Sequence, residues 1–234
     1  MSKESSEINT TGPFIKRKKQ AVIEGQKDVS SAYLFIKRSI DLLGAAIGLL
    51  ITAPVFLFIS MMYLFGDSKG PLFFKQQRFG KNGELFYIYK FRSMIVNADE
   101  RLKQNKELYQ SYIENNYKLE HDEDPRITKL GKFLRKTSLD ELPQLINVLK
   151  GDMSLVGPRP IVEEELREYK QKRNDFLSVK PGITGYWQVS GRSDVGYPER
   201  VDLELYYVNN QSLKLDTRIL IQTIIVVFLR KGAY

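Results

Sequence analysis

Two adjacent carboxylates, Asp140 and Glu141, are the residues of this chain with the clearest capacity for chemistry. If a helix begins beside them, its unpaired N–H groups and positive dipole end favour an ionised carboxylate. An ionised aspartate can attack phosphorus as a nucleophile. Neighbouring carboxylates repel when both face one atom, so a useful division has one attacking and the other holding a divalent cation. Mg2+ suits this role because it prefers oxygen ligands and is commonly shared with substrate phosphates.

The same segment also has a purely structural interpretation. Ser138 and Glu141 have the spacing of a helix capping box, and Pro143 is tolerated in a first helical turn. Apolar residues then recur at i, i+3, i+4 and i+7, with Asp140, Gln144 and Asn147 on the opposite face. The residues of the apolar stripe are Leu142, Leu145, Ile146 and Leu149. The local pattern alone leaves a helix cap and an active site as alternatives.

Basic residues in other segments fit a site for an anionic substrate. Arg159 lies between two prolines, which limits the entropy lost when its guanidinium binds a phosphate. Residues 181–185 and the later Gly-Arg192 pair are rich in glycine, and they form ordinary turns or line the same site. Lys90 and Arg92 project to one face if they lie on a strand. The candidate phosphate contacts are Lys90, Arg92, Arg135, Arg159 and Arg192.

The elements that position these residues begin with an uncharged stretch of 24 residues, 42–65, with Pro54 near its centre. An unbroken helix of this length would reach ~36 Å, enough for a bilayer core of ~30 Å, whereas each half reaches only ~18 Å. Lys and Arg on both flanks favour two cytoplasmic ends. We therefore expect a proline-broken, re-entrant helix, with a spanning helix as the alternative. Lys37 and Arg38 would contact phosphates or lipid, or act as snorkelling anchors.

Shorter elements follow the apolar stretch. Residues 72–79 and 84–91 predict a β-hairpin around a Gly-Lys-Asn-Gly turn. Residues 97–118 predict a charged helix. Residues 219–229 are mostly apolar but too short to span a bilayer, so they form an interfacial amphipathic helix or pack in the core.

The composition excludes several kinds of site. The chain has no cysteine, and His121 is its only histidine, which excludes disulfides, thiolate metal sites and a histidine-dependent triad. No P-loop motif is present. Residues 120–124 are a solvated acidic run or a cation site. The net charge of +8 gathers around the apolar stretch, which disfavours nucleic-acid binding and leaves a non-enzymatic membrane adaptor as the competing function.

Five motifs in one order carry a family resemblance over residues 34–234. They are KRxxD at 37–41, YKFRSM at 89–94, SLDELPQL at 138–145, KGDMSLVGPRP at 150–160 and KPGITG at 180–185. With these motifs the chain resembles the bacterial sugar transferase family, the monotopic phosphoglycosyl transferases, and in particular undecaprenyl-phosphate hexose-1-phosphate transferases. One position departs from the pattern, because Ala53 stands before Pro54 where the family often has serine.

The expected fold is α+β and mostly helical, in a monotopic membrane protein on the cytoplasmic face of the inner (plasma) membrane. A mobile polar tail would cover residues 1–32, and the re-entrant helix, broken at Ala53 and Pro54, would cover 33–66. Residues 67–234 would form the cytoplasmic catalytic domain, with a small hairpin and interfacial amphipathic helices.

The resemblance implies transfer of a sugar 1-phosphate, glucose or galactose, from a UDP-sugar to undecaprenyl phosphate with release of UMP. This would be a first membrane step of exopolysaccharide, capsule or O-antigen synthesis, alongside other glycan-assembly enzymes and without nucleic acid. Asp140 would be the nucleophile that forms an aspartyl-phosphosugar intermediate, and Glu141 would bind Mg2+. The implied substrate contacts are Lys90, Arg92, Arg135, Gln144, Arg159 and Arg192.

Overall fold

The computed structural model describes residues 29–114, 119, 124–191 and 195–228. In chain order, its α-helices are α2 (Ser31–Met62), α3 (Ala98–Gln104), α4 (Lys106–Glu114), α5 (Lys129–Lys136), α6 (Gln144–Lys150), α7 (Glu163–Leu166), α8 (Arg173–Leu177), α9 (Tyr186–Ser190), α10 (Glu199–Asn209) and α11 (Leu213–Phe228). Its strands are β1 (Phe73–Phe79), β2 (Leu85–Phe91), β3 (Ser154–Val156) and β4 (Gly182–Thr184). These elements confirm a mostly helical α+β fold with one small antiparallel hairpin.

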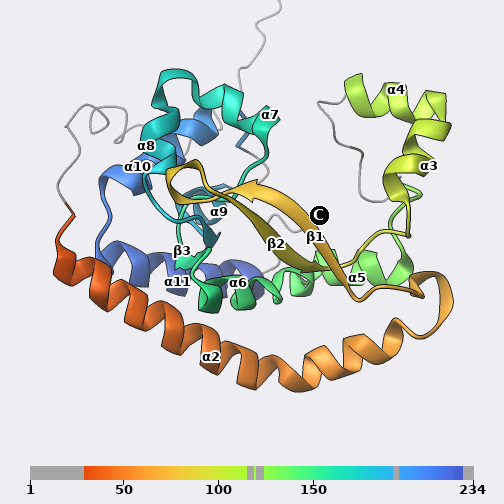
Figure 1. Cartoon of the computed structure of the whole chain (residues 1–234), viewed down its shortest axis with the longest axis horizontal. Helices are drawn as coiled ribbons and strands as arrows, with labels where there is room; N and C mark the ends of the chain where they lie inside the picture. Colours follow the sequence, from red (N-terminus) through yellow and green to blue (C-terminus); the bar gives the residue numbers. More distant parts are fainter. Residues whose placement is uncertain (1–28, 115–118, 120–123, 192–194, 229–234) are drawn as a thin grey trace, which may run out of the picture.

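Several shorter elements pack against the long helix α2. Figure 1 shows α2 along one edge of the molecule, with α11, α6 and α5 beside it and the hairpin beyond them. Ala45 of α2, Ile88 of β2 and Val148 of α6 belong to one buried cluster. Ile59 of α2 and Leu134 of α5 belong to a second cluster. The domain core therefore includes one face of α2 at two places along its length.

Helix α2 continues through Pro54 instead of ending there, so the prediction of a helix broken at Ala53 and Pro54 is wrong for the backbone. Proline removes only the hydrogen bond that its own N–H would make to Leu50, and the helix accommodates this loss by bending. Figure 1 shows the bend, with the concave side toward the rest of the domain. Among the described residues, α2 is the one helix long and apolar enough to cross a membrane.

Polar side chains near the start of α2 hold the helix against the domain. Lys37 Nζ donates to the carbonyl of Val156 at 2.9 Å and pairs with the buried Asp216 at 3.0 Å. Arg38 donates to two carbonyls at the C-terminal end of α6. Asp41 is buried and accepts hydrogen bonds from β3. The structure gives Lys37 and Arg38 contacts within the protein that neither sequence interpretation included, and their roles as phosphate contacts or snorkelling anchors stay predictions.

The predicted hairpin is confirmed. Strands β1 and β2 are antiparallel, with Phe79 opposite Leu85. Asn82 and Gly83 have φ of 58° and 81°, the left-handed conformation that asparagine and glycine tolerate best. The Gly-Lys-Asn-Gly sequence therefore supplies the turn that sets the register of the two strands.

The single helix expected over residues 97–118 is wrong in its middle. The chain is extended at Asn105, where φ is −93° and ψ is 97°, and this residue separates α3 from α4. Its side chain accepts a hydrogen bond from the N–H of Leu108 at 3.1 Å, as an asparagine does at the start of a helix. The last residues of the predicted helix and His121 lie outside the described residues, together with most of the acidic run.

Helix α11 has a buried face and an exposed apolar face. Ile219 is 0% exposed and lies in a core cluster, whereas Ile221, Ile224 and Ile225 are 50–58% exposed. Packing in the core is thus confirmed for one face of the helix, and the interfacial alternative for residues 219–229 stays a prediction for the exposed face. The exposed isoleucines fit the interfacial interpretation, because a helix face of this composition buries its apolar area in a lipid headgroup layer.

Candidate active site

Asp140 and Glu141 lie on a short 3-10 turn, Leu139–Glu141, between α5 and α6. Ser138 precedes the turn with φ of 56°, and its side chain makes no capping hydrogen bond. Helix α6 begins only at Gln144, so the predicted capping box at Ser138 and Glu141 is not formed. The carboxylates therefore belong to a connection that the helix does not need for capping.

Two cations from distant segments meet this turn. Lys90 of β2 places its Nζ 2.6 Å from Glu141 Oε1 and 3.9 Å from Asp140 Oδ2. Arg159 lies 3.6 Å from the same oxygen of Glu141. The carboxylate pair, one lysine and one arginine thus form a compact charged site of the kind the sequence predicted.

The two carboxyl groups have different acidities. Burial raises the pKa of Asp140 to about 6, assisted by the charge of Glu141 and opposed chiefly by Lys90. Burial also acts against ionisation of Glu141, but Lys90 and Arg159 outweigh it and lower the pKa of that group to about 2. The idea that a helix N-terminus keeps Asp140 ionised is not supported, because α6 starts after it. At neutral pH both groups are charged, and Asp140 is the more basic.

Arg135 and Gln144 complete the surroundings of the pair. Arg135 of α5 donates from Nε to Ser93 Oγ at 2.8 Å, and its charge acts to lower the pKa of Asp140. Gln144 is buried and hydrogen bonds to Glu141, which contributes to the low pKa of that group. The structure therefore places four predicted contacts beside the pair, namely Lys90, Arg135, Gln144 and Arg159.

Two other predicted contacts are not brought to this cluster. Arg92 is buried and donates to the backbone carbonyls of Ser68, Pro71 and Met94, because β2 ends at Phe91 and the alternation of side chains ends with it. These bonds give Arg92 a structural role in joining the chain before β1 to the chain after β2. Arg192 lies outside the described residues.

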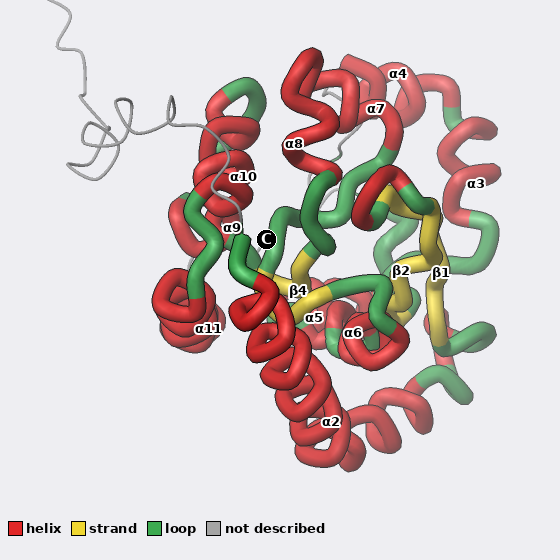
Figure 2. Tube along the Cα trace, turned by 60° about the vertical axis from the view of Figure 1, so that its left-hand side comes forward, coloured by secondary structure: helices red, strands yellow, loops and turns green. Residues whose placement is uncertain are grey.

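Within the glycine-rich segment 181–185, residues 182–184 form strand β4 instead of a loop around an anion (Figure 2). The N–H of Gly182 donates to Pro158 at 2.8 Å, and that of Gly157 donates to Thr184 at 2.9 Å. A Cβ atom at Gly182 would lie 2.0 Å from the backbone nitrogen of Gly157, so only glycine permits this contact. The glycine-rich segment supports the loop of Arg159, and the arginine side chain reaches the carboxylates.

Asn147 is a site residue to which sequence reasoning gave no role. It is 0% exposed, accepts from the N–H of Tyr89 at 3.0 Å, and donates to the carbonyl of Tyr87 at 2.8 Å. These bonds fix α6 to β2 and so set Lys90 beside Glu141. The sequence did place Asn147 on the same helix face as Gln144, and that position could have indicated a role in the site.

The pair is suited to Mg2+ as a partial site. Within the described part of the chain, no group of three or more His, Cys, Asp or Glu side chains could hold a metal ion. Two carboxylates are enough when substrate phosphates and water supply the other oxygens, as is usual for Mg2+. The Lys90 ammonium lies 2.6 Å from Glu141 Oε1, so a metal ion held by this carboxylate would share it with Lys90.

The raised pKa of Asp140 predicts a pH-dependent difference in stability between the protein and its Asp140→Asn variant. Unfolding returns the carboxyl to a pKa of ~3.9, so its burial is unfavourable above pH ~6 and costs nothing below pH ~4. The variant should therefore gain on the order of 2–3 kcal/mol over the native protein as pH rises from 4 to 7. Thermal unfolding of both proteins in detergent measures this difference in stability. A difference that stays constant between pH 4 and pH 7 would contradict the raised pKa of Asp140.

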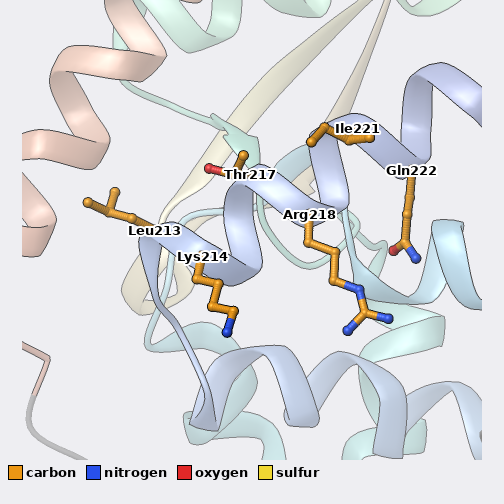
Figure 3. Close-up of a pocket in the computed structure, with 6 residues that line it drawn as sticks. All are labelled: Leu213, Lys214, Thr217, Arg218, Ile221 and Gln222. Carbon is orange, nitrogen blue, oxygen red and sulfur yellow. The ribbon is translucent and has the colours of Figure 1, made fainter.

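A shallow hollow elsewhere is distinct from this site. Figure 3 shows it on α11, where it has a volume of about 450 Å³. Its lining residues are Leu213, Lys214, Thr217, Arg218, Ile221 and Gln222. None of these belongs to the charged cluster around Asp140, so the hollow is not the candidate active site.

Comparison with known proteins gives a consistent result. The family model for bacterial sugar transferases matches residues 32–230. The chain is 49% identical over 203 residues to an undecaprenyl-phosphate galactose phosphotransferase of Salmonella typhimurium, covering 86% of this chain and 42% of the relative. It is 45% identical over 202 residues to the exopolysaccharide production protein ExoY of Rhizobium meliloti, covering 85% and 88%.

A third relative is more distant. The UDP-glucose:undecaprenyl-phosphate glucose-1-phosphate transferase of Escherichia coli is 37% identical over 214 residues, which cover 88% of this chain and 43% of the relative. The chain thus spans less than half the length of the Salmonella and Escherichia relatives and most of the length of ExoY. Since the family model covers most of the chain, the protein belongs to the bacterial sugar transferase family.

Proposed function

We propose that this chain transfers a hexose 1-phosphate, from UDP-glucose or UDP-galactose, to undecaprenyl phosphate. The observation that carries the proposal is the buried Asp140 next to an ionised Glu141, with Lys90 and Arg159 within 4 Å of the pair. Relatives named for galactose and glucose phosphate transfer to this lipid support the substrates. Others named for exopolysaccharide production support a role in building a surface glycan, beside other glycan-assembly enzymes.

The proposed chemistry has two steps. A carboxylate oxygen of Asp140 attacks the phosphorus that bears the sugar, and the bond to the bridging oxygen breaks, which releases UMP. A phosphate oxygen of the lipid then attacks the same phosphorus, which frees Asp140 and leaves the sugar on a lipid diphosphate. Each step exchanges one phosphorus–oxygen bond for another, so no oxidant or additional proton donor is needed.

The cations of the site fit the charge of these substrates. Lys90 and Arg159 offset the negative charge that gathers when a carboxylate approaches a diphosphate, and Arg135 adds charge from a half-buried position. Gln144 keeps Glu141 oriented through its hydrogen bond. Arg192 stays a candidate contact from sequence alone, and Arg92 is not included because its bonds serve the backbone.

Glu141 is the proposed residue that would hold Mg2+, and the bound ion would supply positive charge that offsets the charge of the donor phosphates. Glu141→Gln is expected to raise the Mg2+ concentration for half-maximal activity at least tenfold, since an amide oxygen carries no charge. Initial rates of UMP release across a Mg2+ titration give this value. Glu164→Gln, an exposed carboxylate of α7, is the matched control. An unchanged Mg2+ requirement in Glu141→Gln would remove Glu141 from the metal site.

For the membrane, we propose that the bent helix α2 enters and leaves on the cytoplasmic face. The absence of cysteine from the chain permits single labels at Ser31, the first residue of α2, and at Lys69, beyond the end of α2, both of which are exposed. Both positions should react with an impermeant thiol reagent only when the cytoplasmic face is open. Labelling from opposite faces would show a spanning helix instead.

A panel of UDP-sugars tests the function itself. Purified protein in detergent, with undecaprenyl phosphate and Mg2+, should release UMP from UDP-glucose or UDP-galactose and produce a lipid-linked sugar. Omission of the lipid should limit UMP to a single turnover, because the intermediate then has no acceptor. No UMP from any UDP-sugar would contradict the proposal and favour the membrane adaptor.

A further inference from the structure

A second cluster of charged side chains contacts the backbone of Arg159. Helix α10 supplies Arg200 and Glu204, which are 6% and 0% exposed. Arg200 lies 3.8 Å from Glu204 and 3.0 Å from Glu165 of α7. Glu165 in turn lies 3.6 Å from Arg78 of β1. The cluster joins two helices to the hairpin, and the sequence gave no reason to include these four residues in the site.

Glu204 connects this cluster to the active site. Its Oε1 accepts a hydrogen bond from the backbone N–H of Arg159 at 3.2 Å. The guanidinium of Arg159 lies 3.6 Å from Glu141. Arg159 is therefore held at two points, its backbone by Glu204 and its side chain by Glu141. Loss of the first contact would allow the backbone to shift without changing the charge that Arg159 carries.

The rest of this loop is already constrained, so the N–H of Arg159 is the point that Glu204 controls. Pro158 and Pro160 have no N–H to offer, and both restrict the backbone on either side of Arg159. Hydrogen bonds from Gly182 to Pro158 and from Phe79 to Ile161 hold the two ends of the segment. A carboxylate from α10 completes the attachment between these ends.

We propose that Glu204 is a positioning residue that fixes Arg159 against Glu141 and thereby against the diphosphate of the donor. The proposal rests on the function proposed above. Glu204 contacts Arg159 and Arg200. Arg159 also contacts Glu141, so the effect of Glu204 on the reaction passes through Arg159. A displacement of about 1 Å in a phosphate-binding group can cost ~100-fold in rate, which makes such a support functionally important.

Fold stability alone gives a poor account of Glu204. Burial raises the pKa of its carboxyl to about 7, against the opposing charges of Arg200 and Arg159. Its Oε2 has no hydrogen-bond partner among the residues that the structure describes. Removing one partner of a buried ion pair is costly when the other charge is left uncompensated, so the fold of a Glu204 variant depends on the second partner of Arg200. Glu204→Met should fold, since Arg200 keeps its contact with Glu165.

Hydrogen exchange tests the positioning directly and without any substrate. Because 158 and 160 are prolines and Gly157 becomes the free amino terminus, a peptide covering residues 157–161 reports on only the amides of Arg159 and Ile161. Glu204→Met should speed exchange of one amide in this peptide at least tenfold. Glu204→Gln keeps an oxygen acceptor and should leave exchange within about threefold of the native protein. Asp202→Asn, an exposed carboxylate on the same helix, should change nothing.

Kinetics test whether the contact matters for the reaction. Glu204→Met should lower kcat/KM for the UDP-sugar at least tenfold, and Glu204→Gln should restore most of it. In an Arg159→Ala background, Glu204→Met should cause no further loss, because the residue on which it acts is gone.

The possible outcomes separate the two proposals. Equal losses from Glu204→Met with and without Arg159, or unchanged exchange of the 157–161 peptide, would overturn the positioning role while wild-type UMP release still supports the function. Wild-type protein that releases no UMP would overturn the function, and the exchange experiment would still decide whether Glu204 holds the Arg159 backbone.

Discussion

Asp140→Asn is expected to abolish sugar-phosphate transfer, with UMP release at least ~1000-fold below that of the native protein. The amide has no charge and no free electron pair of comparable reactivity for attack on phosphorus, and loss of a nucleophile is among the largest single-residue effects in catalysis. Initial rates of UMP release with UDP-sugar, undecaprenyl phosphate and Mg2+ give the ratio.

Two measurements show whether this loss is chemical. The variant should unfold at the same temperature as the native protein or higher at pH 7, because the buried carboxylate that it removes is unfavourable there. With radiolabelled UDP-sugar and no lipid acceptor, the native protein should retain label covalently and the variant should not. Asp202→Asn, whose carboxylate is 62% exposed, is the control that should retain both activities. Substantial turnover by Asp140→Asn would exclude Asp140 as the nucleophile.

Gly131→Ala is expected to have the largest effect on stability. Gly131 is a buried residue of α5, and a Cβ atom there would lie 1.8 Å from the carbonyl oxygen of Ser93. That oxygen accepts the N–H of Thr128, so neither backbone can move aside without losing a hydrogen bond. We expect destabilisation of about 3 kcal/mol and a fall in the unfolding midpoint of roughly 6–12 °C.

The substitution should also reduce activity in the fraction that remains folded. Helix α5 carries Arg135 and leads directly into the turn of Asp140, so its displacement moves both. The matched control is Gly196→Ala, because a Cβ atom there would meet no atom within 4 Å. Circular dichroism during heating and UMP release at a temperature below both midpoints measure the two effects. A midpoint for Gly131→Ala within 2 °C of the control would show that the two backbones separate easily, contrary to this expectation.

The charged site was largely predictable from the sequence because its chemistry is carried by residue types. The carboxylate pair alone also fitted a helix cap, but a lysine and an arginine between prolines fit a phosphate, and the structure brings Lys90 and Arg159 to Glu141. The hairpin was predictable for a local reason, since Asn82 and Gly83 adopt the left-handed backbone that their turn requires.

The errors have tertiary causes. Ser138 matched a capping box by spacing, but its φ of 56° turns the chain so that α6 starts beyond Glu141. Arg92 matched the pattern of Lys90, but the strand ends between them. Pro54 predicted a break, whereas packing of α2 against the domain on both sides of the proline favours one bent helix. The spacing of residues in the sequence predicts neither the backbone angle of Ser138, nor the end of β2, nor the packing of α2.

The polar contacts at the start of α2 make this helix an integral part of the folded unit. Without α2, Asp216 would lose Lys37 and Tyr33, and the last carbonyls of α6 would lose Arg38. A foreign anchor of equal length and hydropathy would supply none of these partners. The helix is therefore not an interchangeable module, and chimaeras or N-terminal truncations should be designed to retain it from Ser31 onward.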